Sequence, residues 1–378
     1  MTPAAQTDSF EERWRDLVSG QNRAWWASPA RGGLTVLSWL YGAGVAGYRL
    51  CFEWGWLRSE TLPVPVISIG NLTVGGTGKT TAVRWLARLL QGWGMHPAII
   101  SRGYRAEAGE RRDEGVVVSE GAGEVAPASV AGDEPRLLAL SLPGVPVLAG
   151  RRRARVARRA CAEFSPDVLL LDDALQHWRV RRNLDLVLVS ALNPFGWEHL
   201  LPRGLLRESP RALRRAQAVI VTHSDRIGEA ARAALRARLL EYNPNLVLAE
   251  AVHAPSRIVT LSGPFGEETQ LAPGRWIALS SLGDPHSFER TVRDLGATEV
   301  LPARFPDHHP YSEREIRDLA ARVESEETRG IVTTEKDSAK IPPVWLGSTP
   351  CRVVVVDLRF LSGLDVLEAL VRERIAAH

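Results

Sequence analysis

The stretch 64–90 carries the clearest chemistry in the sequence, because it joins an apolar strand pattern to a glycine-rich loop and a helical pattern. It reads VPVISIGNLTVGGTGKTTAVRWLARLL. Glycines let backbone N–H groups close around phosphate oxygens, and a helix N-terminus adds the positive end of its dipole. Lys79 is expected to reach the β- and γ-phosphates, and the Thr80 hydroxyl to bind Mg²⁺.

One position departs from the strict GxxxxGK[ST] pattern, since Thr73 stands where the first glycine belongs. The half of the pattern that touches phosphate is intact. Strand, GKT and helix together predict nucleotide binding, and the alternative is a glycine-rich turn without a ligand.

Two carboxylates, Asp172 and Asp173, follow the apolar run at 168–171. Strands of an open parallel sheet deliver their carboxyl ends to the ligand crevice, beside the phosphate loop. An aspartate there can hold Mg²⁺ directly or through water. The alternative is an exposed turn. Gln176 and His177, just beyond, are placed to face the same crevice.

Three further segments carry groups suited to phosphoryl transfer. Asp133 opens a helical pattern, where an N-cap is favoured over a catalytic base. The segment FPDHH at 305–309 can supply a histidine base, or a histidine that orients a carboxylate, although a surface loop is equally expected. Arg207 could clamp a phosphate and Glu208 could assist the metal, or the two could form an ordinary surface ion pair.

These groups need a scaffold, and from residue 62 the chain alternates between strand and helix patterns. Short runs rich in Val, Ile and Leu are typical of strands buried on both faces of a parallel sheet. The predicted strands are 64–69, 97–101, 116–118, 145–148, 168–171, 184–189 and 218–222, with helices at 79–90, 134–140 and 153–163. This alternation predicts a doubly wound α/β domain.

A second alternation follows the predicted helix at 228–241 and an extended connection at 246–251. Its strands are expected at 276–280, 298–301, 331–333 and 352–356, and its helices at 285–295, 313–323 and 364–375. We therefore expect an N-terminal helical segment (1–60), a P-loop nucleotide-binding domain (61–245) and a smaller C-terminal α/β domain (246–378).

The stretch 33–57 is apolar and aromatic, but its uncharged part ends at residue 48, short of the roughly 20 residues that a spanning helix needs. Its rings include Trp39 and Trp54, which suit a headgroup layer. The aromatic stretch 9–26, which contains three arginines, precedes it. We interpret the pair as helices lying on or dipping into a membrane. The alternative is a helix that covers the core of the next domain.

Composition narrows the class of protein. The chain has 378 residues and a formal net charge of +3. This near-balance of charge argues against a dedicated nucleic-acid binder. Three cysteines, far apart in the sequence, exclude a disulfide scaffold and a zinc ribbon, and suit a reducing cytoplasm.

Seven motifs in this order make the chain resemble one family, the tetraacyldisaccharide 4'-kinases, or lipid A 4'-kinases. The motifs are IGNLTVGGTGKTT (69–81), SRGY (101–104), AGDEP (131–135), LDDALQH (171–177), LPRGLLRE (201–208), FPDHH (305–309) and TTEKD (333–337). Any one motif is moderately specific, and together they extend over most of the chain. Thr73 is similar to the family's own version of the loop.

The resemblance implies a kinase that moves the γ-phosphate of ATP to the 4'-hydroxyl of a tetraacylated glucosamine disaccharide 1-phosphate, giving lipid IVA. It implies ATP and Mg²⁺ as cofactors, an acylated disaccharide phosphate lipid as substrate, and contact with the cytoplasmic face of the inner membrane through an N-terminal helix. It implies neither a nucleic acid nor a required protein partner.

The resemblance also implies roles for residues that match the family's motifs. Asp133 is expected to activate the sugar hydroxyl in a dyad with His308, assisted by Lys79 and Asp173. The nucleotide loop is expected to consist of Thr73, Val74, Gly75, Gly76, Thr77, Gly78, Lys79 and Thr80. The expected metal ligands are Thr80, Asp172, Asp173 and Glu208. The other residues expected to line the site are Tyr104, Glu134, Arg153, Gln176, Arg207 and Asp307.

Three of the motifs depart from the family's usual pattern. Thr81 replaces a proline, Ala174 replaces a glycine, and Arg-Gly-Leu-Leu at 203–206 replaces Ala-Gly-Pro-Leu. None of these changes removes a proposed catalytic group. Two other functions stay open on the sequence: a non-kinase P-loop NTPase that drives a binding cycle at the membrane, and a membrane-bound adaptor that binds nucleotide without chemistry.

Overall fold

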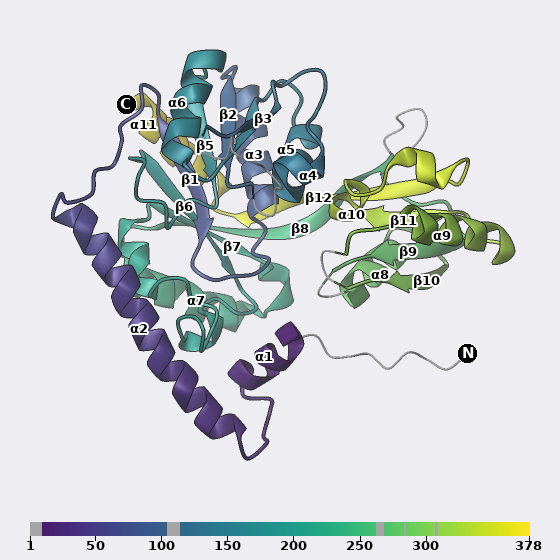
Figure 1. Cartoon of the computed structure of the whole chain (residues 1–378), viewed down its shortest axis with the longest axis horizontal. Helices are drawn as coiled ribbons and strands as arrows, with labels where there is room; N and C mark the ends of the chain where they lie inside the picture. Colours follow the sequence, from purple (N-terminus) through teal and green to yellow (C-terminus); the bar gives the residue numbers. More distant parts are fainter. Residues whose placement is uncertain (1–9, 104–113, 262–267, 283–284, 307–308) are drawn as a thin grey trace. The chain divides into compact units, whose positions relative to one another are not determined.

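The computed structural model describes residues 10–103, 114–261, 268–282, 285–306 and 309–378 (Figure 1). The chain divides into two compact units built from interleaved stretches. Unit 1 contains the residues up to 79 together with 167–252 and 360–378, and unit 2 contains 80–166 and 253–359. The predicted boundaries at 60/61 and 245/246 divide the chain differently and remain predictions.

Unit 1 contains a parallel sheet in the order β8-β7-β6-β1-β5. Its strands are β1 (Val66–Asn71), β5 (Val168–Asp172), β6 (Leu184–Ser190), β7 (Ala218–Thr222) and the first part of β8 (Val247–Thr260). Strand β1 is buried along its whole length and pairs with β5 on one side and β6 on the other. This burial on both faces explains the continuous apolar runs, and the predicted strands are confirmed.

The α-helices described in unit 1 are α1 (Phe10–Ser19), α2 (Ala27–Glu53), α7 (Glu229–Tyr242) and α11 (Leu364–Ala376). The predicted helices at 228–241 and 364–375 are confirmed, and the N-terminal stretch forms two helices as expected. Among the described residues, no helix combines the length and the apolar character that crossing a membrane requires.

Unit 2 contains β2 (Pro97–Ser101), β4 (Val147–Ala149) and β3 (Val116–Ser119) in that order. Strand β4 runs parallel to β2, but β3 runs antiparallel to β4. The predicted sheet is therefore mixed rather than wholly parallel. A single antiparallel strand at the edge of a parallel sheet is a common variant. The helices here are α3 (Lys79–Gly92), α4 (Ala128–Ala131), α5 (Asp133–Ser141) and α6 (Arg153–Phe164).

The rest of unit 2 has strands in the order β10-β9-β11-β12. They are β9 (Arg275–Ser280), β10 (Glu299–Arg304), β11 (Ile331–Thr334) and β12 (Cys351–Ser362), with helices α8 (Pro285–Asp294), α9 (Glu313–Ser325) and α10 (Glu335–Ser338). These strands and the helices α8 and α9 confirm the second predicted alternation. Ser312 begins α9 with a capping box closed by Glu315, which satisfies two backbone N–H groups.

The stretch 246–251 is not the predicted connection. It belongs to β8, which continues to Thr260 and pairs with β7 in unit 1. Along the chain, β8 and β12 each begin in one unit and end in the other. A strand paired with its neighbour cannot be told from an extended linker by local composition, because both favour β-branched residues.

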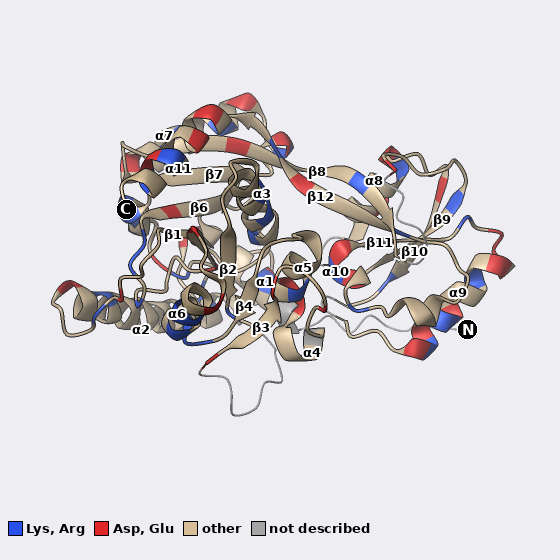
Figure 2. Cartoon of the chain, turned by 90° about the horizontal axis from the view of Figure 1, so that it is seen from above, with Lys and Arg blue, Asp and Glu red and all other residues tan. Residues whose placement is uncertain are grey.

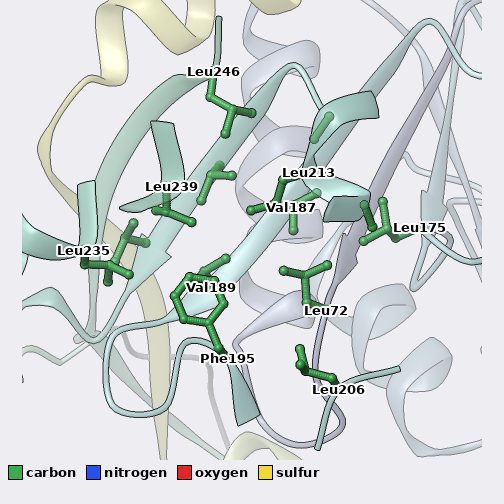
Figure 3. Close-up of a cluster of buried hydrophobic side chains, with 14 of the residues drawn as sticks. Leu72, Leu175, Val187, Val189, Phe195, Leu206, Leu213, Leu235, Leu239 and Leu246 are labelled. Carbon is green, nitrogen blue, oxygen red and sulfur yellow. The ribbon is translucent and has the colours of Figure 1, made fainter. Parts of the chain in front are cut away.

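A hydrophobic cluster in unit 1 fixes the loops that follow its strands (Figure 3). Leu72 follows β1, Leu175 follows β5, and Leu206 precedes Arg207; all three side chains are buried in this cluster. Since side chains in such a core keep defined rotamers, the loops that carry them are held in place.

We predict that Gly70→Ala destabilises unit 1. A Cβ at residue 70 would lie 2.6 Å from the Leu175 Cβ and 2.8 Å from its backbone nitrogen, so β1 or the loop after β5 must move. Overpacking of this kind costs about 1–3 kcal/mol, measurable as a lower midpoint in urea. Gly92→Ala is the control, because no atom lies within 4 Å of a Cβ there. Equal midpoints for the two variants would contradict the prediction.

Candidate active site

The glycine-rich loop connects the end of β1 to the start of α3. Gly75 and Gly78 have φ of 115° and 83°, which L-amino acids with a side chain rarely adopt. Helix α3 begins at Lys79, as predicted, so the backbone N–H groups of its first turn lie directly after the loop. This is the arrangement that binds phosphate groups.

Two buried polar residues support the loop by hydrogen bonds to its Thr77. Asn71 Nδ2 donates a hydrogen bond to Thr77 Oγ1 at 2.9 Å, and Thr222 Oγ1 donates to the Thr77 carbonyl oxygen at 3.1 Å. Sequence reasoning assigned no role to Asn71 or Thr222. Each of them is a polar residue at the end of an apolar strand. The same feature of the sequence pointed to Asp172.

Asp173 pairs with two cations. Its Oδ1 lies 2.5 Å from Arg207 Nη1 and 3.8 Å from Lys79 Nζ. Asp173 has φ of 49°, a left-handed conformation that costs a non-glycine residue about 1–3 kcal/mol and is often found at functional sites. Lys79 and Arg207, two positive charges of the predicted phosphate site, thus both pair with the Asp173 carboxylate.

Arg207 is placed by backbone pairing between its own loop and the glycine-rich loop. The Val74 N–H donates to the Leu205 carbonyl, and the Arg207 N–H donates to the Leu72 carbonyl, each at 2.8 Å. Arg207 Nη1 also lies 3.3 Å from Asn71 Oδ1, and Gln176 Nε2 donates to the Asn71 carbonyl at 3.1 Å. Unit 1 therefore brings together four predicted site residues: Lys79, Asp173, Gln176 and Arg207.

The other predicted metal ligands of unit 1 have different surroundings. Asp172 is buried at the end of β5. Glu208, also buried, accepts a hydrogen bond from Arg215 Nη2 at 2.7 Å, and the Arg215 guanidinium lies 4.5 Å from the Trp178 ring centroid. Within the described ranges, no group of three or more His, Cys, Asp or Glu residues is arranged to hold a metal ion.

Asp133 is the first residue of α5, and the N-cap is Gly132, which has φ of 87°. The N-cap role favoured for Asp133 on the sequence is therefore wrong. Its position fits a first-turn residue, where a negative charge is stabilised by the helix dipole. Glu134 follows in the same turn, and both residues are half-buried.

Unit 2 also carries Thr80, one residue after the start of α3, and Arg153, a buried residue that begins α6. Tyr104, Asp307 and His308 lie outside the described residues. The next residue, His309, hydrogen-bonds Glu315 through Nε2 at 3.0 Å and stacks on Phe305 at 4.8 Å between ring centroids. Unit 2 therefore holds Thr80, Asp133, Glu134 and Arg153 of the predicted site.

Comparisons with known proteins agree on one family. Residues 31–376 match the LpxK family, described as tetraacyldisaccharide-1-P 4'-kinase. Proteins described as tetraacyldisaccharide 4'-kinase from Anaeromyxobacter dehalogenans (strain 2CP-C) and Anaeromyxobacter sp. (strain Fw109-5) are 41% and 42% identical, over 93% of this chain and 94% and 95% of theirs. A crystal structure of LpxK from Aquifex aeolicus in complex with ATP is 27% identical, with a TM-score of 0.71, covering 92% of this chain and 99% of that one.

We predict that Asn71→Ala weakens ATP binding about tenfold. The change removes hydrogen bonds to Thr77 and Arg207, each worth about 0.5–1.5 kcal/mol, and 1.4 kcal/mol corresponds to a factor of ten. Titration calorimetry measures the Kd. Asn243→Ala is the matched control, because that side chain donates two hydrogen bonds to backbone carbonyls elsewhere in unit 1. An unchanged Kd for Asn71→Ala would remove this residue from the loop's support.

Proposed function

The chain belongs to the tetraacyldisaccharide 4'-kinase family and is a lipid A 4'-kinase, and from this premise we propose how its residues share the transfer. The reaction moves the γ-phosphate of ATP to the 4'-hydroxyl of a tetraacylated glucosamine disaccharide 1-phosphate, giving lipid IVA. One observation supports the roles that we assign to these residues. Asp173, beside the glycine-rich loop, forms ion pairs with both Lys79 and Arg207.

The nucleotide half of the site acts by charge and position. Residues 73–80 surround the phosphates with backbone N–H groups, and Lys79 and Arg207 neutralise the charge that spreads over the transferred group. Asp173 keeps the two cations close together, which their mutual repulsion would otherwise oppose. The Asn71 side chain fixes Thr77 and Arg207 relative to each other.

The residues available fit Mg²⁺. The Thr80 hydroxyl and the buried Asp172 carboxylate are hard oxygen donors of the kind this ion prefers. We assign these two residues as its ligands, with Asp173 beside them. The ion supplies positive charge to the β- and γ-phosphate oxygens when bound.

Asp133 receives the proton of the acceptor. A sugar hydroxyl has a very high pKa, so a base must accept its proton as attack on phosphorus proceeds. We assign Asp133 as that base and His308 as its partner, with the second role resting on the resemblance alone. Glu134 and Arg153 are proposed to line the acceptor side.

The assay that tests the function follows ADP release with and without an acylated disaccharide 1-phosphate, and analyses the lipid by mass spectrometry. A kinase releases ADP only with the acceptor and adds one phosphoryl group to it. A non-kinase NTPase, which the family match does not favour, would release free phosphate and leave the lipid unchanged.

In that assay, we expect Asp133→Ala and His308→Ala to lower kcat by about 10²–10⁴, the usual range for loss of general-base catalysis. Lys79→Ala should cost at least as much, because it removes charge from the transferred group. Near-normal turnover by the Asp133 variant would exclude this residue from the chemical step.

We propose that α2 attaches the enzyme to the membrane surface that contains its lipid substrate. One side of the helix packs on the loop at 200–207 of unit 1. Ser38 Oγ donates to the Leu200 carbonyl at 2.8 Å, and Tyr41 donates to the Arg207 carbonyl at 3.0 Å. Other side chains of α2 are apolar and exposed, with Trp39 at 70% and Leu40 at 66%. Arg31, Arg49 and Glu53 are its only charged residues, so it is drawn mostly in tan in Figure 2.

Trp39→Ser combined with Leu40→Ser should weaken binding to vesicles of phosphatidylethanolamine and phosphatidylglycerol. Each large apolar side chain contributes about 1.5–3 kcal/mol when fully buried, so even half burial of both, about 1.5 kcal/mol in all, makes the double change lower partitioning by at least about tenfold. Co-sedimentation measures it. Val344→Ser, at a valine that is 74% exposed in unit 2, should bind as the wild type does. Equal binding by all three proteins would contradict the attachment.

A further inference from the structure

The TTEKD motif at 333–337 has no role in the transfer as described above, although it contains two charged residues in contact with other elements. Its last three residues begin α10, which packs against α5 within unit 2 (Figures 1 and 2). Helix α5 starts at Asp133, so α10 supports the element that carries the proposed base.

Glu335 of this motif is bound by a buried arginine of α3. Arg84 Nη1 donates to Glu335 Oε1 at 2.6 Å, and Nη2 donates to Oε2 at 3.1 Å. This is the two-pronged geometry that fixes the orientation of both groups. The Arg84 side chain is 1% exposed, so the pair works at low dielectric and little competes with it.

Two further groups bind the Arg84 guanidinium. Arg84 Nε lies 2.8 Å from Asp357 Oδ1, and Nη2 donates to the Val356 carbonyl. Arg88, one turn along α3, donates to Asp357 Oδ2 at 3.1 Å. Burial alone would raise the pKa of Asp357, but Arg84, assisted by Ser256 and Arg88, brings it below its ordinary value. Asp357 is thus charged whenever the enzyme works near neutral pH.

We infer that Glu335 is a positioning residue that, through Arg84, fixes α3 against α10 and hence against α5. Helix α3 starts at Lys79 and Thr80, and α5 starts at Asp133. The pair therefore sets the spacing between the phosphate-binding helix and the helix of the proposed base. The inference rests on the role proposed for Asp133.

The other end of α10 is anchored as firmly. Asp337 is fully buried; it accepts hydrogen bonds from the Ser281 N–H at 3.1 Å and from Thr334 Oγ1 at 2.8 Å, and Lys340 Nζ lies 3.5 Å away. These contacts fix α10 to the ends of β9 and β11. Because α10 is held at that end, we expect a change at Glu335 to shift α3 relative to α10 and α5.

The test compares Glu335→Gln with Glu289→Gln. Glu289 is a matched control, since it is buried in the same unit and accepts two hydrogen bonds from Arg304, at 2.6 and 3.0 Å. At temperatures where melting curves show folded protein, we expect Glu335→Gln to lower kcat about ten- to a hundredfold, as small misplacements do. The Kd for ATP should change less than about twofold, because the loop's own supports are intact. Glu289→Gln should keep wild-type kcat.

Arg84→Lys tests the same Arg84–Glu335 pair. Lysine keeps the positive charge but cannot form the two parallel hydrogen bonds. It should lower kcat in the same direction, and the double variant should be no slower than the slower single variant. Folded Glu335→Gln with wild-type kcat would overturn the inference, as would equal losses in Glu335→Gln and Glu289→Gln. Wild-type enzyme that fails to phosphorylate the acylated disaccharide would instead overturn the proposed function.

Discussion

A single carboxylate holds together the cationic part of this site. Asp173 lies within reach of both Lys79, at the start of α3, and Arg207, in a separate loop, and these two cations would repel each other without it. The ends of β1 and β5, the start of α3 and the loop of Arg207 bring these three groups to one place. Strand β5 ends at Asp172, one residue earlier, and α3 begins at Lys79.

Apolar packing fixes the positions of the loops that carry these charged side chains. Leu72, Leu175 and Leu206 each lie next to a functional loop and share one buried cluster (Figure 3). The glycine-rich loop and the Arg207 loop are also paired through their backbones. Helix α2 touches the same region through Tyr41, whose pKa is raised by burial, while the nearby Arg207 lowers it and Glu208 raises it. The proposed membrane helix α2 thus contacts the loop that carries Arg207 of the phosphate site.

Residues that follow a local rule were predictable from the sequence. The glycine-rich loop, the start of α3 at Lys79 and the apolar strand before Asp172 each have a signature within about ten residues, so these three elements followed directly from the sequence. The antiparallel course of β3 and the pairing of β8 depend on partners far along the chain, and local composition does not encode them. Asn71 and Thr222 end apolar strands with a polar side chain, but their shared partner Thr77 is defined only in the folded chain, so their role was missed.

The interleaving of the two units has a consequence for biosynthesis. Residues 360–378, which include α11, complete unit 1, yet the ribosome makes them after all of unit 2. Unit 1 therefore cannot reach its final form while unit 2 is still being translated, and neither unit corresponds to a continuous piece of the gene. A truncation that ends before β12 would leave the sheet that carries the phosphate loop without the α11 segment.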